Sequence, residues 1–206
     1  MMWDQMTEDE LWTELCLCIL SSNVPYELAK SCNKHLADSG LLDGKWIANR
    51  ENAQIAIGKE LQKPIYLPQK KNGELRRYRF PMVRARNIAL AAKFFYRYGD
   101  GITDLLRKSN SHTALRNYLA ENVSGLGLKE SSHFLRNVGY SSSLAVVDSH
   151  LIEFMKNLGL LPADARIILT PKQYYIIENI MIWISRKYQV DLAVFDNAIW
   201  NYMRGN

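Results

Sequence analysis

One stretch of the sequence, VSGLGLKESSHFLRNVGYSSSLAVVDSH at 123–150, restricts the possible folds more than any other. Amphipathic segments at about 112–122 and 129–138 lie on either side of a Ser-Gly-Leu-Gly tetrapeptide at 124–127. Because glycine has no Cβ, the backbone there can adopt positive φ angles and approach another surface closely. The pattern predicts two short helices joined by a tight turn, which we call the helical hairpin (112–138).

Helical spacing also governs most of the remaining chain. Thr7 and Glu10 have the spacing of a capping box at the start of a first helix, after which apolar residues recur at helical intervals. Thr170 followed by Pro171 is the start signal of a long helix that ends at about Lys187. We therefore expect an all-α protein.

The segment at 64–80, PIYLPQKKNGELRRYRF, departs from the helical pattern. It carries β-branched and aromatic residues, and its Asn72-Gly73 pair readily adopts the positive φ angles of a tight hairpin turn. We expect a small β-hairpin here, with Pro68 restricting it to an edge or an irregular strand.

Positive charge is concentrated in the same region. The chain carries a net charge of +5, which favours a polyanionic partner without establishing one. A single acid, Glu74, accompanies seven basic residues, namely Lys70, Lys71, Arg76, Arg77, Arg79, Arg84 and Arg86. This basic segment (70–86) is either a solvated surface or a surface that lies along DNA phosphates, and the interleaved aromatic residues favour DNA.

Several classes of protein are disfavoured by what the sequence lacks. No apolar run approaches the roughly 20 residues that span a bilayer, and acidic residues near the N-terminus do not resemble a signal peptide. Cys16, Cys18 and Cys32 are too few for an iron–sulfur cluster and resemble reduced core residues. We expect no metal, no cofactor and no membrane contact.

The start of the second hairpin helix, at about Lys129, is a candidate phosphate site. Its first N–H groups lack intrahelical acceptors and lie at the positive end of the helix dipole, where an anion is stabilised. Gly125 and Gly127 would permit the close approach of a DNA backbone. The alternative is an ordinary glycine turn between two helices.

Lys129 and Asp148 are the candidate catalytic residues. The dipole at a helix N-terminus disfavours the charged form of an amine, and a neutral amine is what nucleophilic catalysis at carbon requires. Asp148 follows an apolar run at 144–147 and precedes a helix at about 149–158. The alternatives are a phosphate-binding or solvated lysine and an N-cap aspartate, and capping is compatible with catalysis. His133 and His150 are interpreted as helix-surface residues.

The hairpin, the lysine, the spacer and the V-D-x-H sequence closely resemble the helix-hairpin-helix DNA glycosylase superfamily. The stretch GLGLKESSHFLRNVG at 125–139 is most similar to the type-two 8-oxoguanine DNA glycosylases, and ELCLCILSSN (14–23) and RYRFPMVRARNI (77–88) also resemble that branch. The resemblance implies one glycosylase domain at 1–206 with two helical lobes around a cleft. One lobe would span about 25–147, and the other would combine the N-terminal helix with about 148–206.

The resemblance also implies a reaction. The enzyme would extrude an oxidised base from double-stranded DNA, and Lys129 would attack the sugar C1′ to form a Schiff base that permits strand cleavage. Asp148 would help to deprotonate the lysine and stabilise positive charge on the sugar. We expect a monomer in a prokaryotic cytoplasm, associated with the nucleoid.

Further site residues follow from the same resemblance. Asn23 would contact the orphaned cytosine, with a helix C-cap as the alternative, and Arg84 would bind DNA. Trp200 would stack on the extruded base, with a core position as the alternative. The branch usually ends in a lysine whose carboxylate helps to recognise the base, and Asn206 is the candidate substitute. The aspartate is followed by Ser149 where the branch usually has arginine.

Three other functions are compatible with parts of the sequence. The first is a cluster-free relative of endonuclease III that removes oxidised pyrimidines. The second is a non-catalytic helix-hairpin-helix DNA-binding protein, which would not require a lysine and an aspartate at this spacing. The third, a helical interaction protein, leaves the pattern at 123–150 unexplained.

Overall fold

Capping residues set the helix starts. In the computed structural model, the hydroxyl of Thr7 accepts a hydrogen bond from the Glu10 N–H at 3.3 Å, and the Glu10 carboxylate accepts one from the Thr7 N–H at 2.8 Å. Thr170 and Gln173 form the same reciprocal pair. Each box satisfies N–H groups that the first turn of a helix leaves without partners, so both predicted starts are confirmed.

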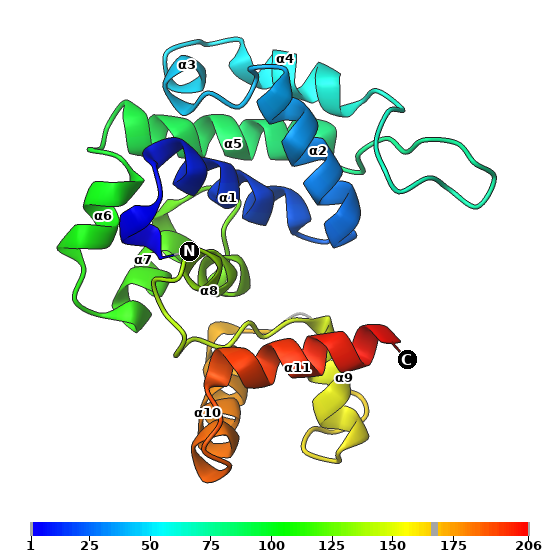
Figure 1. Cartoon of the computed structure of the whole chain (residues 1–206), viewed down its shortest axis with the longest axis vertical. Coiled ribbons are helices and arrows are strands. Elements are labelled where there is room, and N and C mark those ends of the chain that lie inside the picture. Colours follow the sequence, from blue (N-terminus) through cyan, green and yellow to red (C-terminus); the bar gives the residue numbers. More distant parts are fainter. Residues whose placement is uncertain (1, 166–168, 206) are drawn as a thin grey trace.

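The structure describes residues 2–165 and 169–205, and the fold of these residues is all-α, as predicted (Figure 1). A short 3-10 helix at Trp3–Gln5 precedes eleven α-helices within the described residues: α1 Glu8–Ser21, α2 Tyr26–Asp38, α3 Gly44–Ala48, α4 Ala53–Leu61, α5 Pro81–Tyr96, α6 Ile102–Lys108, α7 His112–Asn122, α8 Leu128–Asn137, α9 Ser149–Asn157, α10 Pro171–Lys187 and α11 Leu192–Gly205. The helical hairpin is therefore α7–α8.

Helices α1–α8 form a first lobe around the buried helix α1. Apolar side chains of α1 are packed in one core with those of α2, α5, α6 and α8. The indole of Trp12, on α1, is buried and donates to the Leu42 carbonyl at 2.7 Å. The grouping expected from the sequence placed the N-terminal helix with the second lobe, whereas the apolar face of α1 is buried in the first.

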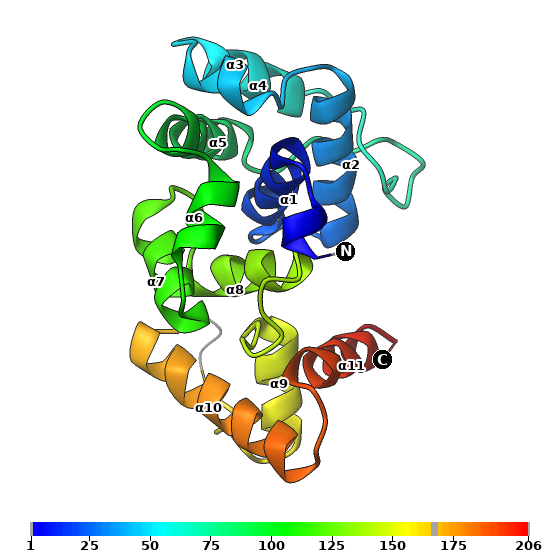
Figure 2. The ribbon, with the colours of Figure 1, turned by 60° about the vertical axis from the view of Figure 1, so that its left-hand side comes forward.

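Helices α9–α11 form a second, smaller lobe with its own core. Its buried residues include Ala145, Leu151, Ile177 and Ile199. An extended segment at 144–148 leads from the first lobe into α9 (Figure 2). Because the two cores are separate, polar contacts have a large part in fixing the two lobes relative to each other. No helix of the described residues combines the length and apolar character needed to cross a bilayer.

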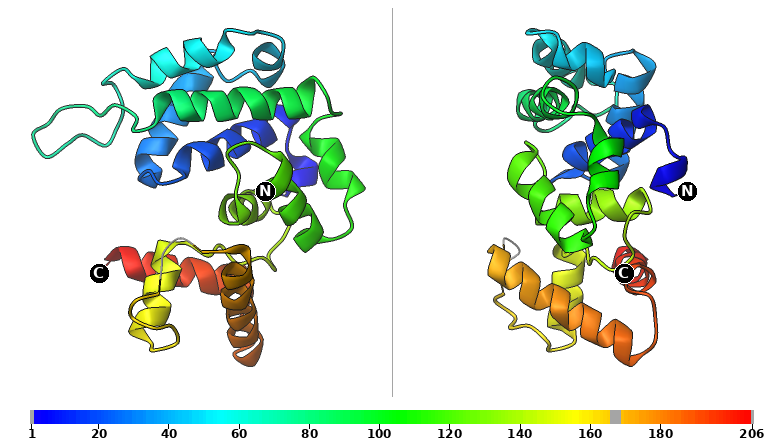
Figure 3. Two further views of the ribbon diagram at one scale, coloured as in Figure 1. Left: turned by 180° about the vertical axis from the view of Figure 1, so that it is seen from behind. Right: turned by 90° about the vertical axis from the view of Figure 1, so that its left-hand side faces the viewer.

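The predicted β-hairpin at 64–80 is wrong. The segment projects from the first lobe as a loop (Figure 3), in which Tyr66 and Arg76 form one isolated antiparallel bridge. The next backbone hydrogen bond runs from the Lys70 N–H to the Glu74 carbonyl at 2.8 Å. Between these two bonded positions, one side of the loop has three residues and the other side has one. Pro68 has no N–H to donate, and its carbonyl accepts from Arg76 Nε instead. The ladder therefore cannot continue.

The turn of this loop also differs from the expected one. The Gly73 N–H donates to the Lys70 carbonyl at 2.9 Å, which centres the turn one residue earlier than Asn72-Gly73. Of that pair only Gly73 has a positive φ angle, 84°. The two-residue hairpin turn that requires positive φ at both positions is therefore not formed.

Candidate active site

The turn of the helical hairpin is fixed by a close contact with α5. Gly125 has a φ of 90°, and a Cβ at this position would lie 2.9 Å from the side chain of Asn87. The Ser124 hydroxyl donates to Asn87 Oδ1 at 3.2 Å. The close approach predicted for the glycine turn is thus made to another helix of the same lobe, and a larger residue at 125 would disturb it.

Lys129 lies in the first turn of α8. The helix begins at Leu128, with Gly127 as its N-cap, and the Gly127 N–H donates to the Glu130 carboxylate at 3.2 Å. The Lys129 side chain is 30% exposed, and its Nζ lies 3.8 Å from Glu130 Oε1. Glu130 therefore both caps α8 and lies beside the Lys129 amine.

Asp148 is the N-cap of α9. Its Oδ1 accepts a hydrogen bond from the Leu151 N–H at 2.9 Å. The capping interpretation is therefore correct, and the cap fixes the carboxylate at the end of the 144–148 segment.

A cleft of about 1350 Å³ brings both residues together with two other predicted site residues. Lys129 and Asp148 line it, and so do Asn23 and Trp200. Lys129 is the single lysine among the described residues that line the cleft. Elements from both lobes contribute to the walls, which places residues far apart in the sequence around one space.

Asn23 reaches the cleft through an unusual backbone conformation. Helix α1 ends at Ser21, and Asn23 has a left-handed φ of 58° in the turn that follows. Arg84, on α5, donates from Nη2 to the Ser22 carbonyl at 2.9 Å. The structure therefore places Arg84 behind this turn, holding it, and not among the residues that line the cleft.

Trp200 lies on α11 and is partly exposed to the cleft. The guanidinium of Arg204, one turn later, lies 4.4 Å from the centroid of its ring. The tryptophan is not one of the buried residues of the second core, and it forms part of the cleft wall together with Arg204. The predicted base-recognition residue Asn206 lies outside the described residues.

His133 also lines the cleft and was not predicted as a site residue. It follows Lys129 by one helical turn, and its Nδ1 has no hydrogen-bond partner among the described residues. Burial, with smaller effects of Lys129 and Arg136, lowers the pKa of His133 to about 4. The imidazole is therefore neutral near pH 7. Its four-residue spacing from Lys129 on an amphipathic helix was the available sequence signal.

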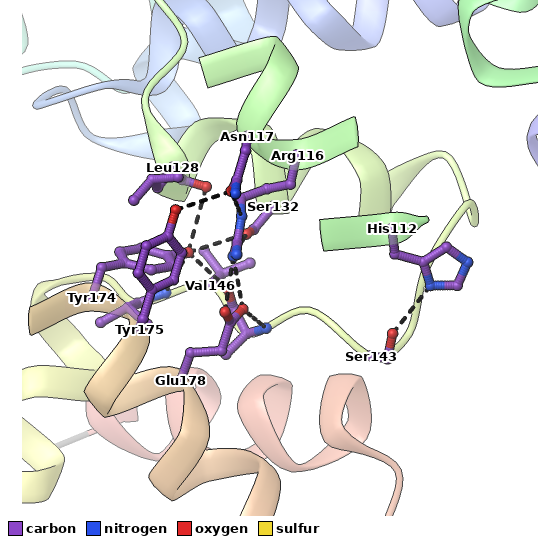
Figure 4. A network of polar contacts seen from close by, with 12 residues as sticks. His112, Arg116, Asn117, Leu128, Ser132, Ser143, Val146, Tyr174, Tyr175 and Glu178 are labelled. Atoms are coloured by element: carbon purple, nitrogen blue, oxygen red, sulfur yellow. Dashed lines mark hydrogen bonds and ion pairs between the residues drawn. The ribbon is translucent and has the colours of Figure 1, made fainter. Parts of the chain in front are cut away.

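Two buried ion pairs join the lobes, and Figure 4 shows the one between Arg116 and Glu178. Arg116, on α7, donates from Nη1 to Glu178, on α10, at 2.9 Å. Arg136, on α8, is paired with Asp196, on α11. Burial raises the pKa of Asp196, although Arg136 acts in the opposite direction. The sequence shows no local pattern for these pairs because their members are 60 or more residues apart.

The described residues contain no group of three or more His, Cys, Asp or Glu side chains placed to hold a metal ion. The polar side chains that line the cleft are an amine, guanidinium groups, carboxylates, carboxamides, imidazoles and hydroxyls. Such a set suits nucleophilic and acid–base chemistry.

Comparison with known proteins gives a consistent result. A family model described as 8-oxoguanine DNA glycosylase matches residues 1–190. The 8-oxoguanine DNA glycosylase/AP lyase of Sulfurisphaera tokodaii is 32% identical over 94% of this chain and 82% of its own. The enzyme of the same description from Methanocaldococcus jannaschii is 30% identical over 96% of this chain and 82% of its own.

Solved structures show the same fold. The Methanocaldococcus jannaschii 8-oxoguanine glycosylase/lyase in complex with a 15mer DNA containing 8-oxoguanine superposes with a TM-score of 0.78 at 26% identity, covering 99% of this chain and 85% of that one. The 8-oxoguanine DNA glycosylase of Thermotoga maritima gives a TM-score of 0.75 at 24% identity, covering 99% and 84%, and this likeness concerns the fold. Neither an endonuclease-III-like enzyme nor a non-catalytic hairpin protein is favoured by these matches.

Proposed function

Because this chain belongs to the 8-oxoguanine DNA glycosylase family, we propose that Lys129 is its Schiff-base nucleophile and Asp148 the acidic partner of that lysine. The protein is a bifunctional 8-oxoguanine DNA glycosylase and AP lyase of base-excision repair, and its substrate is double-stranded DNA that contains 8-oxoguanine. One observation carries the assignment: Lys129 and Asp148, each at a helix N-terminus and each from a different lobe, line one cleft.

The chemistry begins when the damaged nucleotide leaves the base stack, because no side chain can reach C1′ inside the duplex. The Lys129 amine attacks C1′, the bond from C1′ to the base breaks, and its electron pair leaves with the base. Asp148 accepts the proton that the amine loses and stabilises the positive charge that develops on the sugar. Opening of the sugar gives a Schiff base, and loss of a C2′ proton then expels the 3′ phosphate.

Two features would hold the DNA backbone. Glu130 accepts a hydrogen bond from the Gly127 N–H. The N–H groups that follow in the first turn of α8 would bind a phosphate. The basic segment (70–86) would supply a second contact. It borders a groove of about 940 Å³ that shares Pro25 with the cleft, so the groove and the cleft are adjacent. Counterion release would make this contact sensitive to salt.

The other cleft residues have proposed roles in recognition. Asn23, held in its left-handed turn, would face the base opposite the lesion, and Trp200 would stack on the extruded base. Arg84 would act through the turn that it supports. The carboxylate of Asn206 remains the candidate for contact with the oxidised base. A cytoplasmic location in association with the nucleoid belongs to the same proposal, because the substrate is genomic DNA.

Substitution of Asp148 by asparagine tests the proposal, since asparagine is also a good N-cap. The variant Asp148→Asn retains an acceptor for the Leu151 N–H and loses the charge. We expect its single-turnover rate of base excision to fall by about 10²-fold or more, with an unchanged melting temperature. A wild-type rate in Asp148→Asn would leave the aspartate with a capping role alone.

A further inference from the structure

One buried hydroxyl group touches both segments that carry the proposed catalytic pair (Figure 4). The Tyr174 hydroxyl, on α10, lies 3.4 Å from the carbonyl oxygen of Leu128, the residue before Lys129. The same hydroxyl lies 2.8 Å from the Ala145 carbonyl oxygen and 3.5 Å from the Val147 N–H, in the segment that leads to Asp148.

The segment before Asp148 depends on side chains for its geometry. Ala145 N–H donates to Glu178 Oε1 at 3.2 Å, and Val146 N–H donates to Asp196 Oδ2 at 2.9 Å. Val147 N–H, the third in succession, faces Tyr174. The extended segment belongs to no sheet of the described residues, so these side chains replace the ladder that would otherwise fix it.

Tyr174 is itself held firmly. Its side chain is 4% exposed, and its hydroxyl also lies 3.1 Å from the Ser132 hydroxyl on α8. The guanidinium of Arg116 lies 5.5 Å from the centroid of its ring. Burial raises the pKa of Tyr174 well above its ordinary range, so the hydroxyl keeps its proton and serves as a hydrogen-bonding group.

We propose that Tyr174 is a positioning residue, whose hydroxyl sets Lys129 and Asp148 relative to each other by bonding to the Ser132 hydroxyl, on the helix that carries Lys129, and to the Ala145 carbonyl, in the segment before Asp148. The proposal rests on the proposed function of that pair. It gives the residue a role in the reaction although the hydroxyl need not touch the DNA. A misplacement of about 1 Å in a reacting group can cost on the order of 100-fold in rate, so the loss of this bridge has a measurable effect.

The test compares two neighbouring tyrosines on α10. The variant Tyr174→Phe removes the bridging hydroxyl and retains the ring. Its matched control is Tyr175→Phe, which removes a hydroxyl that lies 3.1 Å from Asn117 Oδ1 and contacts neither catalytic segment. Single-turnover excision of 8-oxoguanine opposite cytosine is measured with enzyme in excess, together with the Kd for duplex DNA carrying a non-cleavable abasic analogue and the melting temperature.

We expect Tyr174→Phe to lower the rate constant about 10- to 100-fold, with an unchanged Kd and an unchanged fraction of active enzyme. Tyr175→Phe retains the wild-type rate constant. A purely structural role would instead lower the fraction of active enzyme, counted by the yield of borohydride trapping with DNA in excess, and would leave the rate constant of the folded enzyme as in wild type. That result, or equal losses in the two variants, would overturn the proposal.

Two further variants keep the test decisive. If Tyr174→Phe does not fold, Ser132→Ala removes a hydrogen-bond partner of the same hydroxyl, and a several-fold lower rate constant is expected. A wild-type rate constant in Ser132→Ala would then overturn the proposal. Lys129→Gln is assayed in parallel: if it still excises the base and cleaves the strand, the proposed catalytic pair fails whatever the tyrosine variants show.

Discussion

Arg116 Nη1 donates to both carboxylate oxygens of Glu178, at 2.9 and 3.0 Å, and this pair joins the helical hairpin to α10 of the second lobe. The Arg116 side chain is 0% exposed and that of Glu178 is 7% exposed. Because the arginine cannot reach water, its charge depends on this one carboxylate. The contact also reaches the catalytic segment, since Glu178 accepts from the Ala145 N–H.

Neutralising that carboxylate should therefore destabilise the fold. Glu178→Gln keeps an acceptor for Ala145 but leaves the Arg116 charge buried without a counter-charge, at a cost of about 3 kcal/mol in the free energy of unfolding. Urea denaturation gives the value. In the double variant Arg116→Met/Glu178→Gln the loss should be clearly smaller than the sum of the two single losses, and simple additivity would contradict this account of the pair.

Stability should depend on His133 as the pH falls. The pKa of His133 is lowered by burial from about 6.5 to about 4, so between these values the unfolded chain binds a proton that the folded protein excludes. The contribution of neutral His133 to the free energy of unfolding is fully present above pH 6.5 and is lost as the pH falls toward 4. At pH 5 the loss amounts to about 2 kcal/mol of the free energy of unfolding.

The variant His133→Gln isolates this contribution. Between pH 7.5 and pH 5 the wild type should lose about 2 kcal/mol more stability than the variant, because the other titrating groups are common to both. Urea denaturation at the two pH values is the measurement. Parallel losses in the two proteins would show that His133 titrates normally.

The basic segment (70–86) can be tested through salt. Each phosphate contact contributes about 0.9 to the slope of log Kd against log salt concentration, so Lys71→Gln/Arg77→Gln should lower the slope by about 2. The control Lys45→Gln/Arg97→Gln removes the same charges near α3 and the end of α5, opposite the basic segment in Figure 1. Equal slopes for the two double variants would assign the basic segment to a solvated surface.

Trp200 has a suitable control on a neighbouring helix. If it stacks on the extruded base, Trp200→Ala should weaken productive binding by about 1–3 kcal/mol, or roughly 5- to 150-fold in the half-saturating enzyme concentration. Trp183, on α10, is 61% exposed and does not line the cleft, so Trp183→Ala should behave as wild type. The half-saturating enzyme concentration of each variant is measured by titrating the single-turnover rate with enzyme. Similar effects in Trp200→Ala and Trp183→Ala would count against stacking.

Local features were predictable from the sequence because they depend on neighbours in the chain. Capping at Thr7 and Thr170, the Gly125 turn and the all-α class follow from side chains within a few residues of one another. Lys129 and Asp148 could be selected because each lies at a helix start, and the structure places both in one cleft.

Features that depend on long-range contacts were not predictable. The bridge between Tyr66 and Arg76 fails to extend because its register shifts beyond Pro68, which the Asn72-Gly73 signal does not reveal. The lobe that contains α1 is decided by packing against α2, α5, α6 and α8. Glu178 lies 62 residues from Arg116, and no periodic pattern relates the two.

Borohydride trapping followed by peptide mapping tests the central claim, that Lys129 is the nucleophile. Duplex DNA with 8-oxoguanine opposite cytosine is incubated with wild type, Lys129→Gln and the control Lys156→Gln, which removes a lysine of α9. The account predicts a covalent adduct on the peptide that contains Lys129 in wild type and Lys156→Gln, and none in Lys129→Gln. An adduct of equal yield in Lys129→Gln, or one that maps to another lysine, would contradict it.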